Sequence, residues 1–422
     1  MSERVSKANK CERLPLAMAC ISVAAACMMG GYEFVRSTAA SLFIAAFGSE
    51  NLPYAMAFIP VLMAACILAY GSALSRLGSR RTLMLSLAAS ALVFAGCYAA
   101  VRAGMRWAAA GLYVFTEVYI VVLVEQFWAF INSTLDQRQA RFYNGPILGG
   151  ATLGSVVGGA VLKAFAVRLG SESFILLAAA ALLPTLALSL SAYRLAGEPL
   201  PSAREESGPS GPLNLKLVLG SRVLLLIEAV VALSQVFSTA VNLRFYEILE
   251  SAMPLKDERS AFLGSFWANT NGLATCLQFI LTPLLLKRLS LGVLLVGVPA
   301  VHLLTAGLLL ARPGLGTAGM CLMLFKGLDY SLFRASKELL YIPLSYDARY
   351  RAKQVVDSFT YRFSKGATAG VISLFKALDS LPGPALPAAA LAAAAAWVAT
   401  ASRLAPLGRP LSTPGSSEGT AG

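Results

Sequence analysis

The sequence is poor in the residues that most often carry out catalysis or bind metals. Its 422 residues include one histidine, His302, and seven cysteines, no two of which form a Cys-x-x-Cys pair. A zinc site or a Ser-His-Asp triad needs more of these side chains close together. No Gly-x-x-x-x-Gly-Lys phosphate loop occurs either, so ATP hydrolysis is not indicated. We therefore expect no enzymatic activity, no metal and no cofactor.

Charged residues are also scarce, because apolar residues dominate the chain. Only 14% of the residues are charged, whereas 57% are hydrophobic, and the mean hydropathy is +0.67. A membrane-crossing helix needs ~20 mostly apolar residues, and about twelve such stretches are present. The sequence therefore predicts an all-α polytopic membrane protein, with transmembrane helices near residues 15–47, 53–73, 82–101, 107–131, 145–167, 173–193, 218–249, 260–286, 291–311, 317–340, 356–378 and 385–404.

A polar, proline-containing segment divides these stretches into two groups of six. We expect a tail at 1–14, a first six-helix bundle at 15–193, a linker at 194–217, a second bundle at 218–404 and a tail at 405–422. Lys and Arg gather in the tails, the linker and the loops on the same side, and such residues stay cytoplasmic. The net charge of +13 thus indicates topology rather than nucleic-acid binding. We expect an integral protein of the cell (inner) membrane with both termini in the cytoplasm.

Two glycine-containing motifs bear on how the helices are arranged. Residues 71–81, Gly-Ser-Ala-Leu-Ser-Arg-Leu-Gly-Ser-Arg-Arg, are similar to the loop signature of the major facilitator superfamily, with Ser75 at the usual acidic position and Gly78 at the turn. Members of that superfamily have two six-helix halves with a substrate site near the middle of the bilayer. A stripe of small residues at 149–159 indicates close helix packing.

Charged residues occur well inside only some of the predicted membrane helices. A charge at the bilayer centre costs at least ~2.5–3.5 kcal/mol, so such residues normally face a watery path and mark a functional site. The affected stretches are the first, fourth, seventh and tenth, which is the spacing of the cavity-lining helices in a 6+6 transporter. Their embedded charges are Glu33, Arg36, Glu117, Glu125, Arg244, Glu247, Lys326, Asp329, Arg334, Lys337 and Glu338.

The tenth stretch carries the densest set of these charges. At 100° per residue, one face of a helix there presents Lys326, Asp329, Tyr330, Phe333, Arg334, Lys337 and Tyr341, with Glu338 at its margin. Arg and Lys suit phosphate, and Tyr330 or Phe333 can stack on a base. Pairs within the helix, Lys326 with Asp329 and Arg334 with Glu338, are the structural alternative. In the first stretch, the i, i+3 spacing of Glu33 and Arg36 likewise suggests a local salt bridge, the alternative being that Arg36 faces the cavity and Glu33 tunes it.

The same tract resembles the ATP/ADP translocase family of nucleotide carriers. The matching residues are Tyr330-Ser-Leu-Phe333, Lys337-Glu338, Tyr341-Ile-Pro-Leu344, Tyr32 to Thr38, Phe127 to Asn132 and Ala140 to Tyr143. This resemblance implies that Lys337, Glu117 and Arg36 take part in nucleotide recognition or transport. The chain differs from that pattern at Ala39, where family members that exchange ATP for ADP have a lysine.

We therefore expect a secondary transporter that exchanges or takes up a nucleotide or similar phosphorylated anion by alternating access. The predicted substrate-binding residues are Lys337, Arg334, Lys326, Tyr330, Phe333, Arg36, Glu117 and Arg244. The predicted coupling or gating residues are Glu33, Glu247, Asp329 and Glu338. Two alternatives stay open: a proton-coupled transporter of another organic anion or drug-like solute, and a non-transporting membrane scaffold. The sequence does not indicate an oligomeric state.

Overall fold

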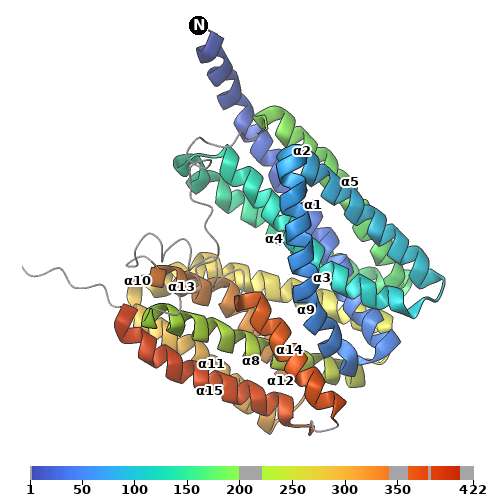
Figure 1. Cartoon of the computed structure of the whole chain (residues 1–422), viewed down its shortest axis with the longest axis vertical. Helices are drawn as coiled ribbons and strands as arrows, with labels where there is room; N and C mark the ends of the chain where they lie inside the picture. Colours follow the sequence, from blue (N-terminus) through green and yellow to red (C-terminus); the bar gives the residue numbers. More distant parts are fainter. Residues whose placement is uncertain (1, 199–220, 342–359, 379–381, 409–422) are drawn as a thin grey trace, which may run out of the picture. The chain divides into compact units, whose positions relative to one another are not determined.

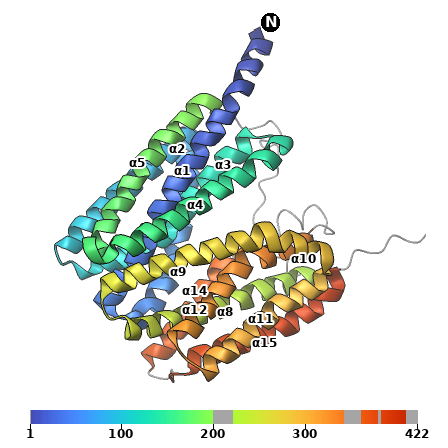
Figure 2. The same ribbon diagram turned by 180° about the vertical axis from the view of Figure 1, so that it is seen from behind.

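The regular structure of the described residues is entirely helical. The computed structural model describes residues 2–198, 221–341, 360–378 and 382–408. Its helices, drawn in Figure 1 and from behind in Figure 2, are α1 (Ser2–Phe47), α2 (Leu52–Arg102), α3 (Arg106–Thr134), α4 (Gln137–Leu169), α5 (Ser171–Ala196), α8 (Arg222–Ala252), α9 (Lys256–Cys276), α10 (Thr282–Arg288), α11 (Leu291–Ala311), α12 (Leu315–Leu328), α13 (Arg334–Tyr341), α14 (Tyr361–Ala377) and α15 (Ala385–Leu404). The described residues also contain two short 3₁₀ turns, η1 (Ser49–Asn51) and η6 (Ala405–Gly408), and two π turns, η2 (Leu277–Leu281) and η3 (Asp329–Phe333).

The predicted all-α membrane fold is confirmed. By length and composition, 8 helices in the described part of the chain are suited to crossing a membrane. Each predicted stretch falls on a helical segment, although the number twelve stays a prediction. The first stretch is longer than expected, since the helical backbone of α1 begins at Ser2. The predicted linker lies largely outside the described residues, as do Ile342 to Leu344 of the Tyr-Ile-Pro-Leu motif.

Helix α2 contains two of the predicted stretches, separated by a sharp turn at Gly78. A straight helix of its 51 residues would be about 77 Å long, far more than the ~30 Å hydrocarbon core of a bilayer. Gly78 breaks it with a φ of 78° and a ψ of 168°, a conformation that glycine adopts readily. The turn expected from the loop signature is therefore present. The backbone N–H of Arg80 donates to the carboxylate of Glu198 at 3.2 Å, which brings an acid to the loop that has Ser75 in place of its own.

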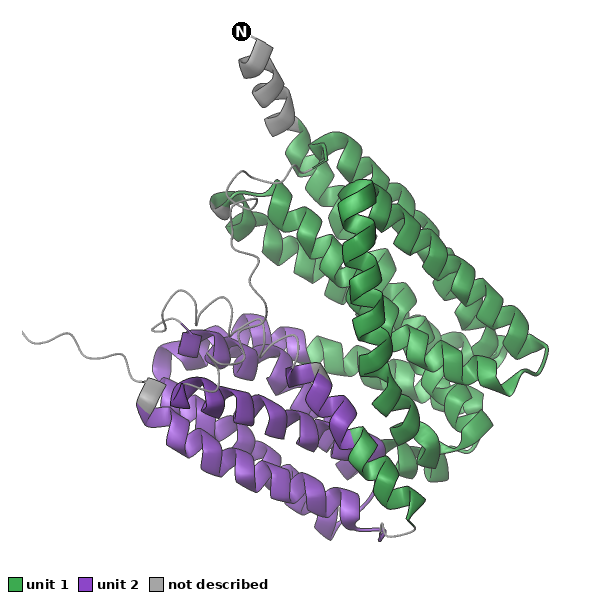
Figure 3. Ribbon diagram, in the orientation of Figure 1, with its two compact units in different colours: residues 1–210, 245–273, 369–380 green, residues 211–244, 274–368, 381–422 purple. Residues whose placement is uncertain are grey.

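The chain separates into two compact units, which Figure 3 colours green and purple. Unit 1 comprises residues 1–210, 245–273 and 369–380, and unit 2 comprises 211–244, 274–368 and 381–422. Unit 1 therefore holds α1 to α5, the end of α8, most of α9 and the second half of α14. Unit 2 holds most of α8, the last residues of α9, the elements from η2 to the first half of α14, and α15.

In unit 1, α1 packs along both α4 and α5 (Figure 2). The small-residue stripe of α4 lies directly on the backbone of α1. A Cβ atom on Gly154 would lie 2.1 Å from the carbonyl oxygen of Ala26, and one on Gly158 would lie 2.5 Å from that of Gly30. Because no side chain fits there, the stripe is confirmed as a helix-packing surface.

In unit 2, α11 packs against α15 and α12. Its core includes Trp397 and the sole histidine, His302, both fully buried. The two rings stack with their centroids 5.5 Å apart, and His302 also contacts Phe237 and Phe325. Within the described residues, neither nitrogen of His302 has a hydrogen-bond partner. The histidine is thus a core residue surrounded by aromatic rings.

The tenth predicted stretch is not a regular α-helix. It runs from α12 through the π turn η3 into α13. A π turn accommodates about one extra residue, so positions after Phe333 are rotated relative to those before Asp329. The helical wheel that placed Lys326 and Tyr341 on one face is therefore wrong beyond the turn.

Candidate functional site

Two embedded charges of α1 face each other inside unit 1. Glu33 is fully buried, and its Oε1 lies 3.7 Å from Nη1 of Arg36 one turn later. The side chain of Arg36 keeps 15% of its surface exposed. The local pair that the i, i+3 spacing suggested is therefore present, with the cation as its more accessible member.

Helix α9 supplies two further contacts to this pair. The guanidinium carbon of Arg36 lies 3.4 Å from the ring centroid of Trp267, and the ring of Tyr32 is 5.5 Å away. The side-chain amide of Asn271 donates to Oε1 of Glu33 at 2.8 Å. We call Glu33, Arg36, Trp267 and Asn271 the Arg36 cluster. Sequence reasoning missed Trp267 and Asn271, whose only signal was their four-residue spacing within an apolar stretch.

Two other predicted acids also lie in unit 1. Glu117 on α3 interacts electrostatically with the buried Tyr113 and Tyr246, and so does Arg36. The structure therefore brings Glu117 into the surroundings of the Arg36 cluster. Glu247 instead forms an ion pair with Lys376 at 3.1 Å.

A second group of embedded charges lies in unit 2. Lys326 and Asp329 are buried, with 8% and 6% of their surface exposed. The ammonium of Lys326 lies 3.4 Å from the hydroxyl of Ser238, and the hydroxyl of Tyr361 donates to Asp329 Oδ2 at 3.3 Å. We call Lys326, Asp329, Ser238 and Tyr361 the Asp329 cluster. Asp329 also interacts electrostatically with three cations, Lys326, Lys337 and Arg334.

The two aromatic residues predicted to stack on a base have different surroundings. Tyr330 is 38% exposed, and its ring centroid lies 5.7 Å from Nζ of Lys326. Phe333 is buried and packs edge-on against Trp397 at 5.1 Å. Tyr330 is therefore placed better than Phe333 to meet a ligand beside a cation.

The remaining predicted residues, Arg244 on α8 and Glu338 on α13, are half-buried. A further acid on α8, Glu228, was not among the predicted residues; it accepts a hydrogen bond from Thr360. Among the described residues, no group of three or more His, Cys, Asp or Glu side chains is arranged to hold a metal ion. Of the predicted site residues, unit 1 holds Glu33, Arg36, Glu117 and Glu247, and unit 2 holds Arg244, Lys326, Asp329, Tyr330, Phe333, Arg334, Lys337 and Glu338.

Comparison with known sequences points to a single group of transporters. Residues 300–406 match the family model of the TLC ATP/ADP transporter. The chain is 25% identical to "ADP,ATP carrier protein 2, chloroplastic" of Arabidopsis thaliana and 24% identical to "ADP,ATP carrier protein 1, chloroplastic" of the same plant. Each alignment covers 90% of this chain and 72% of the carrier. The resemblance to the ATP/ADP carriers is confirmed.

Solved structures with the same fold are also transporters. A bacterial homologue of the iron transporter ferroportin, in an inward-facing state, superposes with a TM-score of 0.66 at 15% identity, covering 92% of this chain and 100% of that one. A D-xylose–proton symporter gives 0.61 at 11% identity, covering 90% and 97%. A nucleoside transporter gives 0.60 at 13% identity, covering 93% and 98%. The fold is thus of the major facilitator type, as predicted.

Proposed function

We propose that this chain, a membrane protein of major facilitator type similar to the ADP,ATP carriers, is a secondary transporter of nucleotides or similar phosphorylated anions. It works by alternating access, either exchanging nucleotides across the membrane or taking them up. In the proposed cycle the chain acts without enzymatic chemistry and without a resident cofactor. We propose that it lies in the cell (inner) membrane with both termini in the cytoplasm. The distribution of Lys and Arg supports this orientation.

One observation carries this proposal: two cations embedded in apolar helical stretches each lie close to an aromatic ring, Arg36 in α1, which is long enough to cross a bilayer, and Lys326 near the end of α12. Arg36 lies against Trp267 and Tyr32, and Lys326 against Tyr330. A nucleotide carries the matching chemistry, since its phosphates are anionic and its base is a flat π system. Arginine binds phosphate oxygens through paired N–H donors while its face stays stacked on a ring.

The acids beside these cations have a role in the same cycle. Glu33 faces Arg36, and Asp329 interacts with Lys326, Arg334 and Lys337. A cation enclosed in a site without water carries a large desolvation free energy unless a nearby anion offsets its charge. We propose that these carboxylates offset part of that charge while the substrate is absent, and that phosphate takes over when it binds. Glu247 and Glu338 are the further coupling candidates, whereas Glu117 and Arg244 belong to the substrate path.

The direct test is counterflow in proteoliposomes. Vesicles loaded with unlabelled ADP are given labelled ATP, ADP and other nucleotides outside, and labelled nucleosides without phosphate serve as the specificity control. Saturable accumulation of at least one nucleotide, but of no nucleoside, is the expected result. Absence of uptake for every nucleotide, by protein that remains folded and monodisperse, contradicts the proposed substrate class.

A pair of lysine variants tests where the phosphate binds. Lys337→Gln removes a cation near Asp329, and a lost charge-assisted hydrogen bond of ~1.5–3 kcal/mol corresponds to about a tenfold to hundredfold rise in KM. Lys287→Gln is the matched control, because Lys287 is exposed on α10 and far along the chain from the embedded charges. Equal effects of the two substitutions would show that net charge, not a phosphate contact at Lys337, governs uptake.

A further inference from the structure

One face of α9 makes a continuous series of contacts with helices of the first predicted bundle. The residues of this face recur every three or four positions, which aligns them along one side of a helix. Every contact described below lies within unit 1. We call this face the α9 seam and define it by Asp257, Ser260, Gly264, Trp267 and Asn271.

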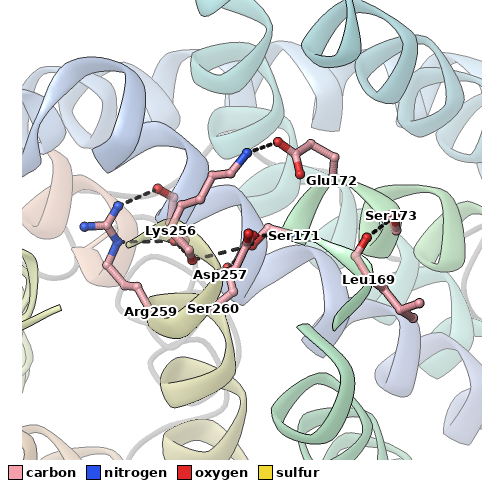
Figure 4. Close-up of polar contacts among 9 residues, drawn as sticks. Leu169, Ser171, Glu172, Ser173, Lys256, Asp257, Arg259 and Ser260 are labelled. Carbon is pink, nitrogen blue, oxygen red and sulfur yellow. Dashed lines mark hydrogen bonds and ion pairs between the residues drawn. The ribbon is translucent and has the colours of Figure 1, made fainter. Parts of the chain in front are cut away.

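At its first turn, the α9 seam binds the start of α5 (Figure 4). Oδ1 of Asp257 accepts hydrogen bonds from the backbone N–H of Ser171 at 2.8 Å and from its hydroxyl at 2.6 Å. The hydroxyls of Ser171 and Ser260 are 2.8 Å apart. Lys256 pairs with the carboxylate of Glu172. Asp257 thus acts as an N-terminal cap of α5 although it lies on another helix, and the helix dipole favours its negative charge.

The same end of α9 is tied to α1. Arg259 is almost fully buried, with 1% of its surface exposed, and donates to both the carbonyl and the hydroxyl oxygen of Ser41 at 3.2 Å. The hydroxyl of Ser41 donates to the carbonyl of Lys256 at 2.6 Å. Beyond the end of α1, Ser49 donates its backbone N–H and its hydroxyl to Glu250 of α8. A buried arginine with backbone partners fixes this end in place.

One turn further, α9 crosses α4 at two glycines. A Cβ atom on Gly264 would lie 2.8 Å from the carbonyl oxygen of Gly159, and one on Gly159 would lie 2.5 Å from that of Gly264. The backbones therefore touch, which leaves no space for water between them. Next to this crossing, Leu162 and Phe174 form part of a fully buried apolar cluster.

The far end of the α9 seam holds the Arg36 cluster. Trp267 lies eleven residues beyond Lys256, which is about 16 Å along a helix. Trp267 contacts the guanidinium of Arg36, and Asn271 binds Glu33. One helix face therefore carries both the polar contacts of the first turn of α9 and the residues that hold Arg36.

We propose that the α9 seam closes one end of the carrier and, in the closed state, fixes the orientation of Arg36. Trp267 and Asn271 are positioning residues: the indole holds the guanidinium plane, and the amide holds the carboxylate that faces it. When the α9 seam opens, Arg36 loses its contact with Trp267, and Asn271 no longer binds Glu33. The affinity of the carrier for its substrate therefore changes as this end opens. The link to nucleotide rests on the proposed function, whereas the closure itself does not.

A disulfide across the seam tests whether it must part during transport. In a cysteine-free background, Ser171→Cys with Ser260→Cys replaces two hydroxyls that are 2.8 Å apart. We expect oxidation to form the bond and to lower nucleotide counterflow at least tenfold, with recovery on reduction. The two single variants are the controls, and oxidation leaves their transport unchanged. Failure of the bond to form, or full transport by the crosslinked protein, overturns the proposal.

A second experiment tests closure without any nucleotide. Gly264→Leu places a side chain where the backbones touch and is expected to hold the seam open. We expect a single Ser260→Cys to react with a membrane-impermeant maleimide at least threefold faster in that variant. Gly96→Leu is the control, since a side chain there meets nothing within 4 Å. Unchanged reactivity in folded Gly264→Leu protein overturns the seam, whatever the outcome of the transport assays.

The positioning of Arg36 has its own readout. Trp267→Leu removes the ring, whereas Trp267→Phe keeps an aromatic face for the guanidinium. We expect Trp267→Leu to raise the KM for nucleotide about tenfold with kcat within twofold, as when binding is weakened equally in ground and transition states, and Trp267→Phe to restore most of the loss. Equal KM values for the two variants would refute a positioning role for the indole.

Discussion

The buried acids of the Arg36 cluster and the Asp329 cluster have similar hydrogen-bond partners but lie in backbone segments of different conformation. Glu33 accepts a hydrogen bond from the amide of Asn271 at 2.8 Å and faces Arg36 along an unbroken α-helix. Asp329 accepts from the hydroxyl of Tyr361 at 3.3 Å and opens a π turn. In both cases a neutral donor from another helix supports the carboxylate. A second difference lies in the number of cations around each carboxylate.

That number has energetic consequences. The described ion pairing of Glu33 is with Arg36 alone, whereas Asp329 interacts with Lys326, Lys337 and Arg334. A buried carboxylate that loses its sole cation is left uncompensated, while one with several cations keeps part of its compensation. The Arg36 cluster should therefore be the less tolerant of substitution.

The largest expected effect comes from removing Arg36. Arg36→Leu leaves Glu33 buried without its cation, at a cost of ~3–5 kcal/mol in the free energy of unfolding. Lys326→Leu should cost clearly less, because two other cations still act on Asp329. Unfolding by SDS titration in mixed micelles measures both values. The double variant Glu33→Leu with Arg36→Leu should recover much of the loss, since it removes the buried carboxylate together with its cation.

If Lys326→Leu proved as costly as Arg36→Leu, the number of neighbouring cations would not explain the difference between the clusters. Arg403→Leu is the matched control, because Arg403 is exposed near the end of α15. Its unfolding free energy should stay within ~0.5 kcal/mol of that of the unchanged protein.

The next effect compares the two neutral donors. Asn271→Leu and Tyr361→Phe each take one hydrogen bond from a buried carboxylate, which costs ~1–3 kcal/mol. The loss should be greater for Asn271, whose bond is 2.8 Å long, than for Tyr361, whose bond is 3.3 Å long. The same SDS titration gives the comparison. A greater loss for Tyr361→Phe would show that Asp329 depends on the hydroxyl more than on its cations.

A third comparison separates ligand contact from core packing within the tenth stretch. Tyr330→Leu removes a half-exposed ring beside Lys326, and loss of base stacking worth ~1–3 kcal/mol predicts a KM raised about fivefold or more. Phe333→Leu loosens the contact with Trp397 and should lower the unfolding free energy by ~1 kcal/mol while the KM stays within twofold. Counterflow kinetics and unfolding on the same preparations distinguish the two. A raised KM for Phe333→Leu, with an unchanged KM for Tyr330→Leu, would indicate that Phe333 and not Tyr330 contacts the substrate.

Much of the fold was predictable from the sequence because a bilayer restricts what an apolar stretch can form. The positions of the membrane helices and the turn at Gly78 follow from hydropathy and from the conformational freedom of glycine. The close packing of α4 on α1 was also predictable, because glycine has no side chain and lets two helix backbones touch.

The candidate sites were predictable only in part, because sequence patterns describe one helix at a time. The spacing of Glu33 and Arg36 indicated their pairing, since both lie on one regular helix. Trp267 and Tyr361 reach these clusters from elsewhere in the chain, and no periodicity within the first or tenth stretch indicates them. The π turn at Asp329–Phe333 was also unpredictable, because a wheel at a fixed angle has no place for an extra residue.

The smallest expected effect comes from a third pair of opposite charges, Glu247 and Lys376, and it tests whether burial makes the difference. Their atoms are closer, at 3.1 Å, than those of Glu33 and Arg36, yet the side chain of Glu247 is 23% exposed whereas that of Glu33 is 1% exposed. Water screens such a pair, so Lys376→Met should lower the unfolding free energy by ~1 kcal/mol or less, and high salt should reduce even that loss. A loss as large as that of Arg36→Leu, measured in the same titration, would mean that separation rather than burial ranks these pairs. It would also indicate that Glu247 is held for a structural reason and not as a coupling residue.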